Sequence, residues 1–211
     1  MADKKRPGSD DNADKKKSDI SRRGFLKGAG LTALSMASLH EAKAAEATLR
    51  VSGPGPMPLT LKINGKTHKL QIEPSETLAE TLRTTLGMTG TKVSCDRGTC
   101  SACTVWLDGA TMCSCMTLTV DVAGRAVTTI EGLASEDGTL HPVQEAFIEK
   151  DATMCGFCTP GMVMSCAALL ARNSSPTLED VRTACSGNYC RCGTYPNVFE
   201  ATLAAAKKGA S

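Results

Sequence analysis

The first regular pattern in the chain is an alternation of apolar and polar residues over 59–63 and again over 70–72. Between the two segments lies Asn64-Gly65, a pair that favours the positive φ angles of a type I′ turn. Period-two alternation on both sides of such a turn predicts a β-hairpin. Gly and Pro residues over 53–58 precede the hairpin and predict a linker.

The apolar spacing then lengthens to four residues, at Leu78, Leu82 and Leu86. This spacing predicts a helix that begins at Pro74-Ser75, ends at Gly87 and packs its apolar face on the hairpin. Two more strands are predicted, one over 104–107 with the turn Asp108-Gly109 after it and one over 126–130.

From residue 141 onward the pattern becomes helical. The signals are a proline in the first turn, an N-cap with an acidic first turn, and a Ser- and Pro-containing break between helices. They predict helices starting at His141-Pro142, running over 160–170, starting at Thr177–Asp180, and running over 197–207. A small helical domain follows from this reading.

The chain has an unusual balance of residue types: eleven cysteines against four Phe, two Tyr and one Trp in 211 residues. Aromatic residues normally supply much of the buried area of a core. Bound metal is one substitute, because ligation free energy becomes folding free energy, and disulfides are the other.

Residues 1–44 predict a leader that is removed. A charged run is followed by Ser21–Lys27 (SRRGFLK), a mild apolar stretch over 28–39, and an A-x-A site at Ala42–Ala44. This order is that of a secretory signal, and SRRGFLK resembles the twin-arginine export signal, so we expect a periplasmic protein. The apolar stretch is too short for a stable membrane span.

Charge supports the same division of the chain. Residues 1–44 carry ten Lys or Arg and six Asp or Glu, a balance of +4, whereas residues 45–211 carry fourteen and sixteen, a balance of −2. The basic character belongs to the leader, and we therefore expect no nucleic-acid partner.

The first group of cysteines is Cys95, Cys100 and Cys103, completed by Cys115. The C-x4-C-x2-C spacing with a distant fourth cysteine is the plant-type arrangement for a [2Fe-2S] cluster. Zinc sites favour paired C-x2-C knuckles, and disulfides need no fixed local spacing. An iron-sulfur cluster is therefore favoured over zinc or a disulfide.

A second group comprises Cys155 and Cys158 and, 31 intervening residues later, Cys190 and Cys192. Taken singly, these pairs fit zinc about as well as iron. Their occurrence after a plant-type motif favours a second [2Fe-2S] cluster and hence an electron relay. Arg191, between two proposed ligands, either tunes the potential of that cluster or pairs with a surface carboxylate.

The remaining cysteines, histidines and methionines carry weaker signals. Cys113 competes with Cys115 as fourth ligand by its position, and packing is expected for Cys166 and Cys185. Histidines and methionines without partners at ligand spacing are expected to lie on the surface or to fill the core: His68, His141, Met162 and Met164.

Five stretches resemble the iron-sulfur subunits of molybdenum hydroxylases, the family of xanthine dehydrogenase and aldehyde oxidoreductase. They are CDRGTCSACTVWLDG, SCMTL, LHPVQEAF, CGFCTPGM and GNYCRCGTYPN, and the similarity runs from about Leu59 to Ala206. With an exported leader, the chain is most similar to the subunits of periplasmic aldehyde oxidoreductases.

The resemblance implies an α+β fold: a β-grasp (plant-type ferredoxin-like) domain over 59–132, after a linker over 45–58, and a four-helix bundle domain over 133–211. The two groups of cysteines would hold two [2Fe-2S] clusters, with Cys115 as fourth ligand of the first. No substrate site is expected in this chain.

The partner implied by the resemblance is a large molybdopterin-binding subunit, which oxidises an aldehyde or an N-heterocycle. Electrons would pass through the second group of cysteines to the first, and on to an FAD subunit or another acceptor such as a cytochrome. The chain has no Gly-rich nucleotide loop, so the flavin would be bound elsewhere.

Two residues depart from the family pattern. Met154 stands where the family usually has a Gln that contacts the pterin, and Ser101 stands where it often has Gly. Two other classes of protein stay open from sequence: a free two-cluster ferredoxin, and a binding module stabilised by zinc or disulfides without a redox role.

Overall fold

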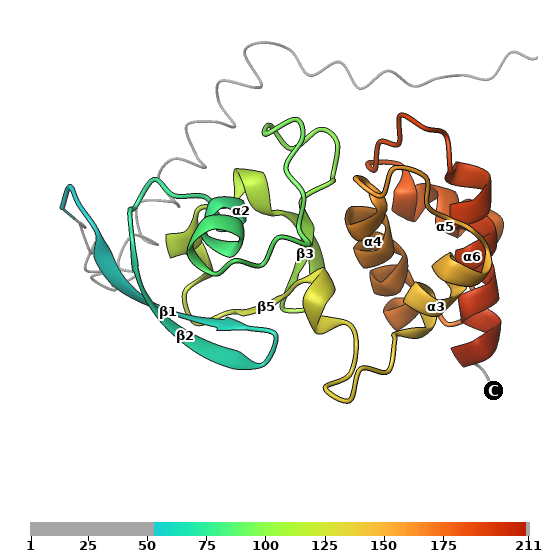
Figure 1. Ribbon diagram of the computed structural model, residues 1–211, viewed down its shortest axis with the longest axis horizontal. Coiled ribbons are helices and arrows are strands. Elements are labelled where there is room, and N and C mark those ends of the chain that lie inside the picture. The colour runs from blue at the N-terminus through green and yellow to red at the C-terminus, as the bar shows by residue number, and fades with distance from the viewer. Residues whose placement is uncertain (1–52, 210–211) are drawn as a thin grey trace, which may run out of the picture. The chain divides into compact units, whose positions relative to one another are not determined.

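The computed structural model describes residues 53–209, and the predicted leader lies outside the described residues. Its elements form a mixed five-stranded sheet and a group of helices (Figure 1). The strands are β1 (Met57–Ile63), β2 (Lys66–Ile72), β3 (Thr104–Leu107), β4 (Ala110–Cys113) and β5 (Ala126–Thr128). The fold class is therefore α+β, as predicted.

The sheet has the order β2-β1-β5-β3-β4, with β1 and β5 parallel and the other pairs antiparallel. The predicted hairpin is present as β1 and β2, and Asn64 and Gly65 have φ angles of 49° and 77°. β1 begins two residues inside the predicted linker. β5 ends at Thr128, earlier than predicted, because the chain turns into η5 (Ile130–Gly132).

A short helix covers the sheet through two fully buried leucines, Leu78 and Leu82. It consists of α2 (Leu78–Glu80) and the π-helical turn η2 (Thr81–Thr85). The prediction that it begins at Pro74-Ser75 was wrong: the Thr77 hydroxyl accepts a hydrogen bond from the Glu80 N–H, and the Glu80 carboxylate accepts one from the Thr77 N–H. This capping box sets the first turn at Leu78.

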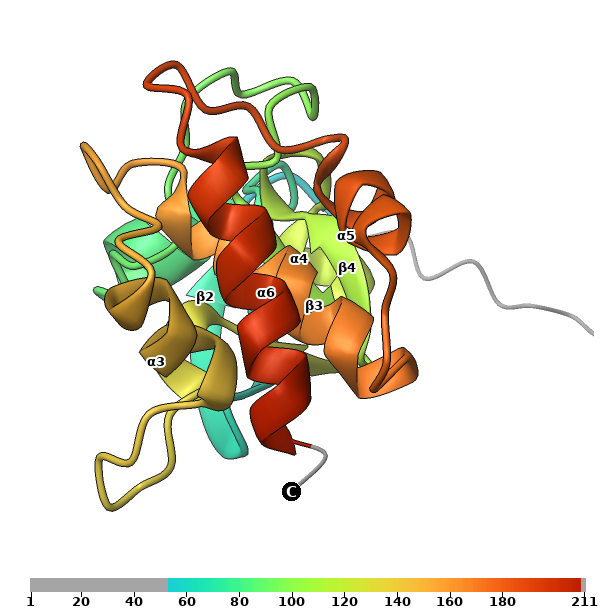
Figure 2. The ribbon, with the colours of Figure 1, turned by 90° about the vertical axis from the view of Figure 1, so that its right-hand side faces the viewer.

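The second half of the described chain contains α3 (Pro142–Glu149), α4 (Thr159–Arg172), α5 (Leu178–Cys185) and α6 (Tyr195–Gly209). These lie within about two residues of the predicted helices. They share one core, to which Val143, Met162, Val181 and Val198 contribute fully buried side chains. Figure 2 shows α6 in front of α4, with α3 and α5 to either side.

The sheet and the helices meet along β3 and α4. The Trp106 indole N–H donates a hydrogen bond of 2.9 Å to the Met164 carbonyl oxygen in α4. Gly161 lies so close to the loop before β3 that a Cβ atom there would be 2.3 Å from the Ser101 carbonyl oxygen. The absence of a side chain at Gly161 therefore allows α4 to approach this loop.

Two further helical turns connect β4 to β5: η3 (Ser114–Met116) and η4 (Thr119–Val122).

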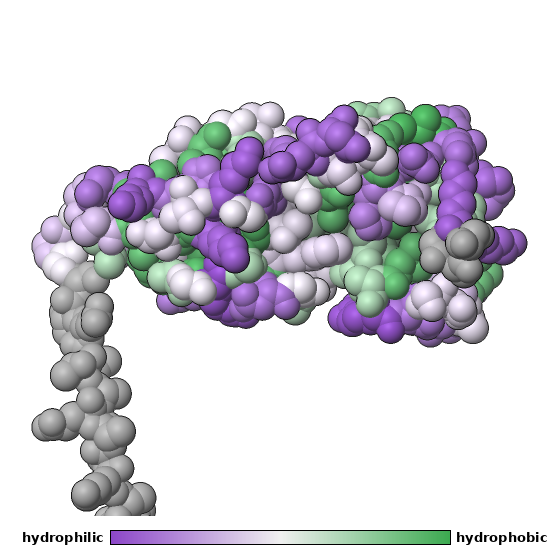
Figure 3. Space-filling view, turned by 90° about the horizontal axis from the view of Figure 1, so that it is seen from below, coloured by the Kyte–Doolittle hydropathy of each residue, from purple (hydrophilic) through white to green (hydrophobic). Residues whose placement is uncertain are grey.

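On the face drawn in Figure 3, hydrophilic residues are interspersed with smaller hydrophobic areas. This mixture is ordinary for a surface in contact with water. Across residues 53–209, the helices are too short or too polar to cross a membrane.

Candidate metal centres

The first group of cysteines surrounds the loop that enters β3. Cys95 and Cys100 lie in this loop and are partly exposed, whereas Cys103, just before β3, and Cys115, in η3, are buried. The loop residues Asp96, Gly98 and Ser101 all have positive φ angles, between 51° and 71°. This left-handed backbone curls the loop.

Thiol contacts show that the four side chains of the first group face a common site. The Cys95 thiol contacts that of Cys100, and the Cys103 thiol contacts that of Cys115. Cys95 is near enough to Cys115 to act on it electrostatically. The Thr99 N–H donates to Cys95 Sγ at 3.3 Å. The structure therefore brings together all four residues predicted from the spacing.

Two thiols of the first group differ in acidity. A hydrogen bond from the Thr99 side chain, assisted by the Arg97 backbone, lowers the pKa of Cys95 to about 6. Desolvation by burial raises the pKa of Cys115 to about 11. Of these two thiols Cys95 ionises the more readily, and a bound cation favours ionisation of the buried Cys115 thiol.

The second group lies where two helices begin. Cys158 is the N-cap residue of α4 and Cys155 precedes it, while Cys190 and Cys192 occupy the loop before α6. Thiol contacts join Cys158 to Cys190 and Cys155 to Cys192. Cys155 and Cys192 are exposed, unlike any cysteine of the first group.

The same division of acidity occurs in the second group. Burial opposes ionisation of Cys190, but hydrogen bonds from the side chain and backbone of Thr194 outweigh it and lower its pKa to about 7. Burial, with the neighbouring Cys190 thiol, raises the pKa of Cys158 to about 12. The Thr194 hydroxyl lies 3.2 Å from Cys190 Sγ.

The donor sets fit a cluster of two metals better than one ion. In each group the thiols contact one another in two pairs, Cys95 with Cys100 and Cys103 with Cys115 in the first, and Cys158 with Cys190 and Cys155 with Cys192 in the second. Tetrahedral zinc needs four donors around one point, whereas a [2Fe-2S] cluster takes four thiolates on two irons.

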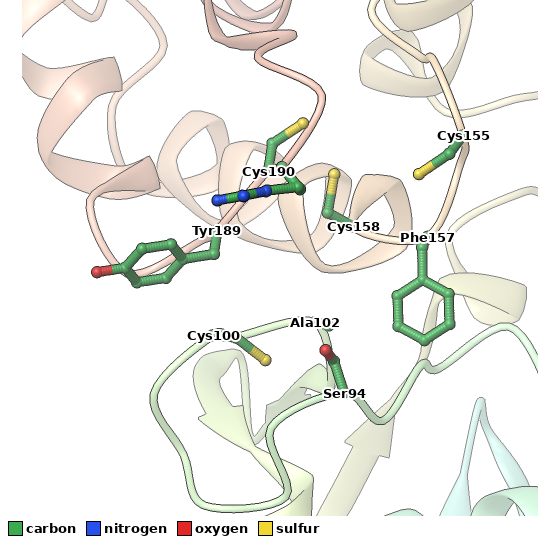
Figure 4. Close-up of a pocket in the computed structure, with 9 residues that line it drawn as sticks. Ser94, Cys100, Ala102, Cys155, Phe157, Cys158, Tyr189 and Cys190 are labelled. Atoms are coloured by element: carbon green, nitrogen blue, oxygen red, sulfur yellow. The ribbon is translucent and has the colours of Figure 1, made fainter.

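One cavity of about 400 Å³ separates the two groups (Figure 4). In this view Cys155, Cys158 and Cys190 lie on one side, and Cys100 and Ala102 lie on the other. Arg191, singled out in the sequence for its place between two cysteines, also lines the cavity.

Two hydrogen bonds connect the loops of the two groups directly. The Tyr189 N–H donates to the Cys100 carbonyl oxygen at 3.1 Å, and the Asn188 side-chain amide donates to the Ser101 carbonyl oxygen at 3.1 Å. The sequence did not identify Asn188 as important, although a buried amide needs partners. Thr194 and Tyr195 were likewise missed, because their contacts depend on the folded loop.

The other candidate residues lie away from this arrangement or beside it. The Cys113 thiol lies 3.8 Å from Ser101 Oγ, at the edge of the first group. Cys166 and Cys185 are buried in the helical core with their sulfur atoms 3.5 Å apart, as expected for packing residues. Met162 and Met164 are fully buried, which confirms them as core residues.

His68 and His141 have different surroundings. His141 caps α3: its Nδ1 accepts a hydrogen bond of 3.2 Å from the Val143 N–H. His68 is paired with Leu61 across the hairpin, and its buried Nε2 has no hydrogen-bond partner among the described residues.

Two family models match the chain. A 2Fe-2S iron-sulfur cluster binding domain matches residues 61–129, and a [2Fe-2S] binding domain matches residues 129–203. The chain is also 41% identical over 198 residues to the aldehyde oxidoreductase iron-sulfur-binding subunit PaoA of Escherichia coli (strain K12), covering 86% of each protein.

Solved structures agree with the sequence relatives. The fold matches that of quinoline 2-oxidoreductase from Pseudomonas putida 86 with a TM-score of 0.70 and 39% identity, over 74% of this chain and 96% of that chain. It matches aldehyde oxidoreductase from Desulfovibrio gigas with a TM-score of 0.69 and 38% identity, over 74% of this chain and 18% of that chain.

Both matched domains are [2Fe-2S] domains, so these clusters are the cofactors of the chain. The relatives are subunits or parts of oxidoreductases. The chain therefore belongs to the family of iron-sulfur subunits of molybdenum hydroxylases.

Proposed function

We propose that this chain is the electron-transfer subunit of an exported molybdenum hydroxylase that oxidises an aldehyde or an N-heterocycle. The observation that carries the proposal is that Cys100 of the first group and three cysteines of the second line one cavity, with hydrogen bonds joining the loops of the two groups. When bound, a [2Fe-2S] cluster accepts and releases one electron. Two such sites side by side form a relay.

The proposed ligands are the eight cysteines predicted from the spacing. The first cluster would be held by Cys95, Cys100, Cys103 and Cys115, and the second by Cys155, Cys158, Cys190 and Cys192. Cys115 is preferred to Cys113 because its thiol contacts that of Cys103, whereas the Cys113 thiol lies beside Ser101 Oγ and the Gly98 carbonyl oxygen. Hydrogen bonds from Thr99 and Thr194 would stabilise sulfur-borne negative charge, and Arg191 would add a positive charge nearby.

A large molybdopterin subunit is proposed as partner at the second site. Met154 and Phe157, beside its cysteines, are large apolar residues that remain 66% and 46% exposed. Exposed apolar residues next to exposed ligands are typical of a docking surface. The match to the Desulfovibrio gigas aldehyde oxidoreductase covers only 18% of that longer chain, which supports a large partner subunit for this chain.

The first site would pass electrons on to an FAD subunit or a cytochrome. We also propose that the two matched regions are separate structural domains, a β-grasp domain over 59–132 and a four-helix bundle domain over 133–211. The four helices that share one core support the second assignment.

The periplasm is the proposed location, on the basis of the SRRGFLK sequence in the leader. The test is the double substitution Arg22→Lys with Arg23→Lys. We expect it to abolish the appearance of mature protein in the periplasmic fraction. Export that is unchanged would remove this part of the proposal.

The main test is copurification of the tagged chain from its native source. We expect a large subunit that contains molybdopterin to accompany it. A free two-cluster ferredoxin would instead purify alone with both clusters present, and a zinc- or disulfide-stabilised module would be colourless. Either outcome would replace the proposed function.

A further inference from the structure

A short segment after α5 connects the first group of cysteines to the second. It consists of Asn188, Tyr189 and Cys190. We propose that Asn188 and the Tyr195 hydroxyl are positioning residues that hold this crossing segment and thereby fix the electron path between the two sites. This inference rests on the proposed function, because it assigns these residues a role in the relay.

Asn188 is held by hydrogen bonds at three of its polar groups. It is only 4% exposed, and its side-chain amide donates to the Ser101 carbonyl oxygen at 3.1 Å. Its backbone N–H donates to the Cys185 carbonyl oxygen at 2.9 Å, and its own carbonyl oxygen accepts from the Tyr195 hydroxyl at 2.9 Å. A buried amide with these partners ties the end of α5 to the first loop.

The Tyr195 hydroxyl holds the other side of the segment. It accepts a hydrogen bond of 2.8 Å from the Cys190 N–H and donates one of 2.9 Å to the Asn188 carbonyl oxygen. One hydroxyl therefore uses its donor and one of its acceptor positions to close the loop across Tyr189. Tyr195 is itself the first residue of α6, so the loop is attached to a helix.

The clamped residue, Tyr189, carries a direct link between the two sites. Its N–H donates to the Cys100 carbonyl oxygen at 3.1 Å, and its carbonyl group is bonded to Cys190. Cys190 and Cys100 are thus joined by covalent bonds and a single hydrogen bond. One electron leaves the second site and one is gained by the first, with no proton transferred and no bond broken.

The receiving side of the link is also rigid. The Ser101 carbonyl oxygen, next to Cys100, accepts hydrogen bonds from the Thr104 N–H at 3.3 Å and the Thr104 hydroxyl at 2.7 Å, besides that from Asn188. Gly161 of α4 packs against the same oxygen, so closely that there is no room for a side chain at this position. Removal of the Asn188 or Tyr195 contact should therefore loosen the crossing segment rather than the receiving loop.

The test uses the copurified complex and two pairs of matched variants. Tyr195→Phe removes the bridging hydroxyl, whereas Tyr189→Phe removes an exposed hydroxyl and keeps the backbone N–H. Asn188→Asp places a carboxylate against the Ser101 carbonyl oxygen, whereas Asn173→Asp keeps the acceptor that Ser175 N–H uses. The readouts are iron content, the spin–spin interaction between the two reduced clusters, and the rate of electron transfer between them.

We expect wild type and both controls to give the same spin–spin interaction. Tyr195→Phe and Asn188→Asp should retain both clusters, weaken that interaction, and slow the transfer about tenfold, less than the roughly hundredfold cost of a 1 Å misplacement of reacting groups. Two intact clusters with unchanged interaction and rate in both variants would overturn the inference. Absence of two cluster signals in wild type would instead overturn the proposed function.

If Tyr195→Phe loses the second cluster, Asn188→Asp alone tests the inference, because the Asn188 side chain contacts the loop of the first site. Loss of a cluster in that variant as well would assign the two residues to cluster assembly and would also overturn the inference.

Discussion

The two cysteine groups differ in how the chain assembles them. The first takes three of its four residues from one loop of nine, 95–103, and the fourth from η3 shortly after it. The second takes its two pairs from loops separated by α4 and α5. The first group includes two buried cysteines, whereas the second includes two exposed ones, Cys155 and Cys192.

The difference has a functional reading within the proposed relay. Exposed thiols and apolar neighbours suit a site that faces a partner subunit, and buried thiols suit a site held by its own domain. In one respect the groups agree. Each has one cysteine whose pKa is lowered beside a threonine, Cys95 to about 6 and Cys190 to about 7.

Substitution of a single cysteine should have the largest effect, because it should remove one cluster and leave the other. Cys158→Ala should remove the second cluster and leave the first, while Cys115→Ala should do the reverse, because each deletes one of four ligands. Iron content should fall by about half, and one of two spin-resonance signals should disappear.

Cys113→Ala is the matched control for Cys115→Ala, since the two residues differ by two positions. We expect it to retain both clusters. Loss of the first cluster in Cys113→Ala, with retention in Cys115→Ala, would assign the fourth ligand to Cys113 instead.

Close packing between the two groups gives the next largest effect. In Gly161→Ala the new Cβ would lie 2.3 Å from the Ser101 carbonyl oxygen, so the loop of the first group or α4 must move. We expect a loss of about 1–3 kcal/mol in the free energy of unfolding, as for other overpacked sites. Urea unfolding measures it.

Two other glycines have more free space around them than Gly161 and serve as comparisons for this loss of stability. A Cβ at Gly187 would lie 3.2 Å from the Ser101 hydroxyl oxygen, and one at Gly53 would meet nothing within 4 Å. The loss of stability should therefore decrease from Gly161→Ala to Gly187→Ala to Gly53→Ala. Equal losses at all three positions would show that the two groups are not tightly packed against each other.

Features that depend on residues close together in the sequence could be predicted from it. The first group of cysteines was predicted because its spacing is local, and α5 was predicted because Thr177 and Asp180 cap it. The network of Asn188 and Tyr195 was not, because it joins loops that become neighbours only when α4 and α5 pack. The helix start at Thr77 was missed although its Glu80 partner is visible in the sequence.

Acid should weaken the helical region before the sheet region, which is the smallest effect. Burial lowers the pKa of His141 below its ordinary 6.5, so its capping contribution is complete above pH 6.5 and is lost as pH falls through and below that value. Hydrogen bonding to the Thr77 backbone lowers the pKa of Glu80 below its ordinary 4.5, so the cap of α2 persists to lower pH.

The expected loss at His141 is about 1 kcal/mol, the usual contribution of an N-cap. Asn is an N-cap residue that does not titrate, so His141→Asn should make the unfolding free energy less dependent on pH between 8 and 5.5. A variant with the same pH dependence as wild type would show that His141 does not act as this cap.

The most direct test of the relay is metal analysis combined with spin resonance on the complex purified from its native source. We expect iron and acid-labile sulfide in equal amounts, no stoichiometric zinc, and two distinct signals on reduction that interact with each other. Colourless protein with zinc, or a single iron-sulfur signal, would contradict it.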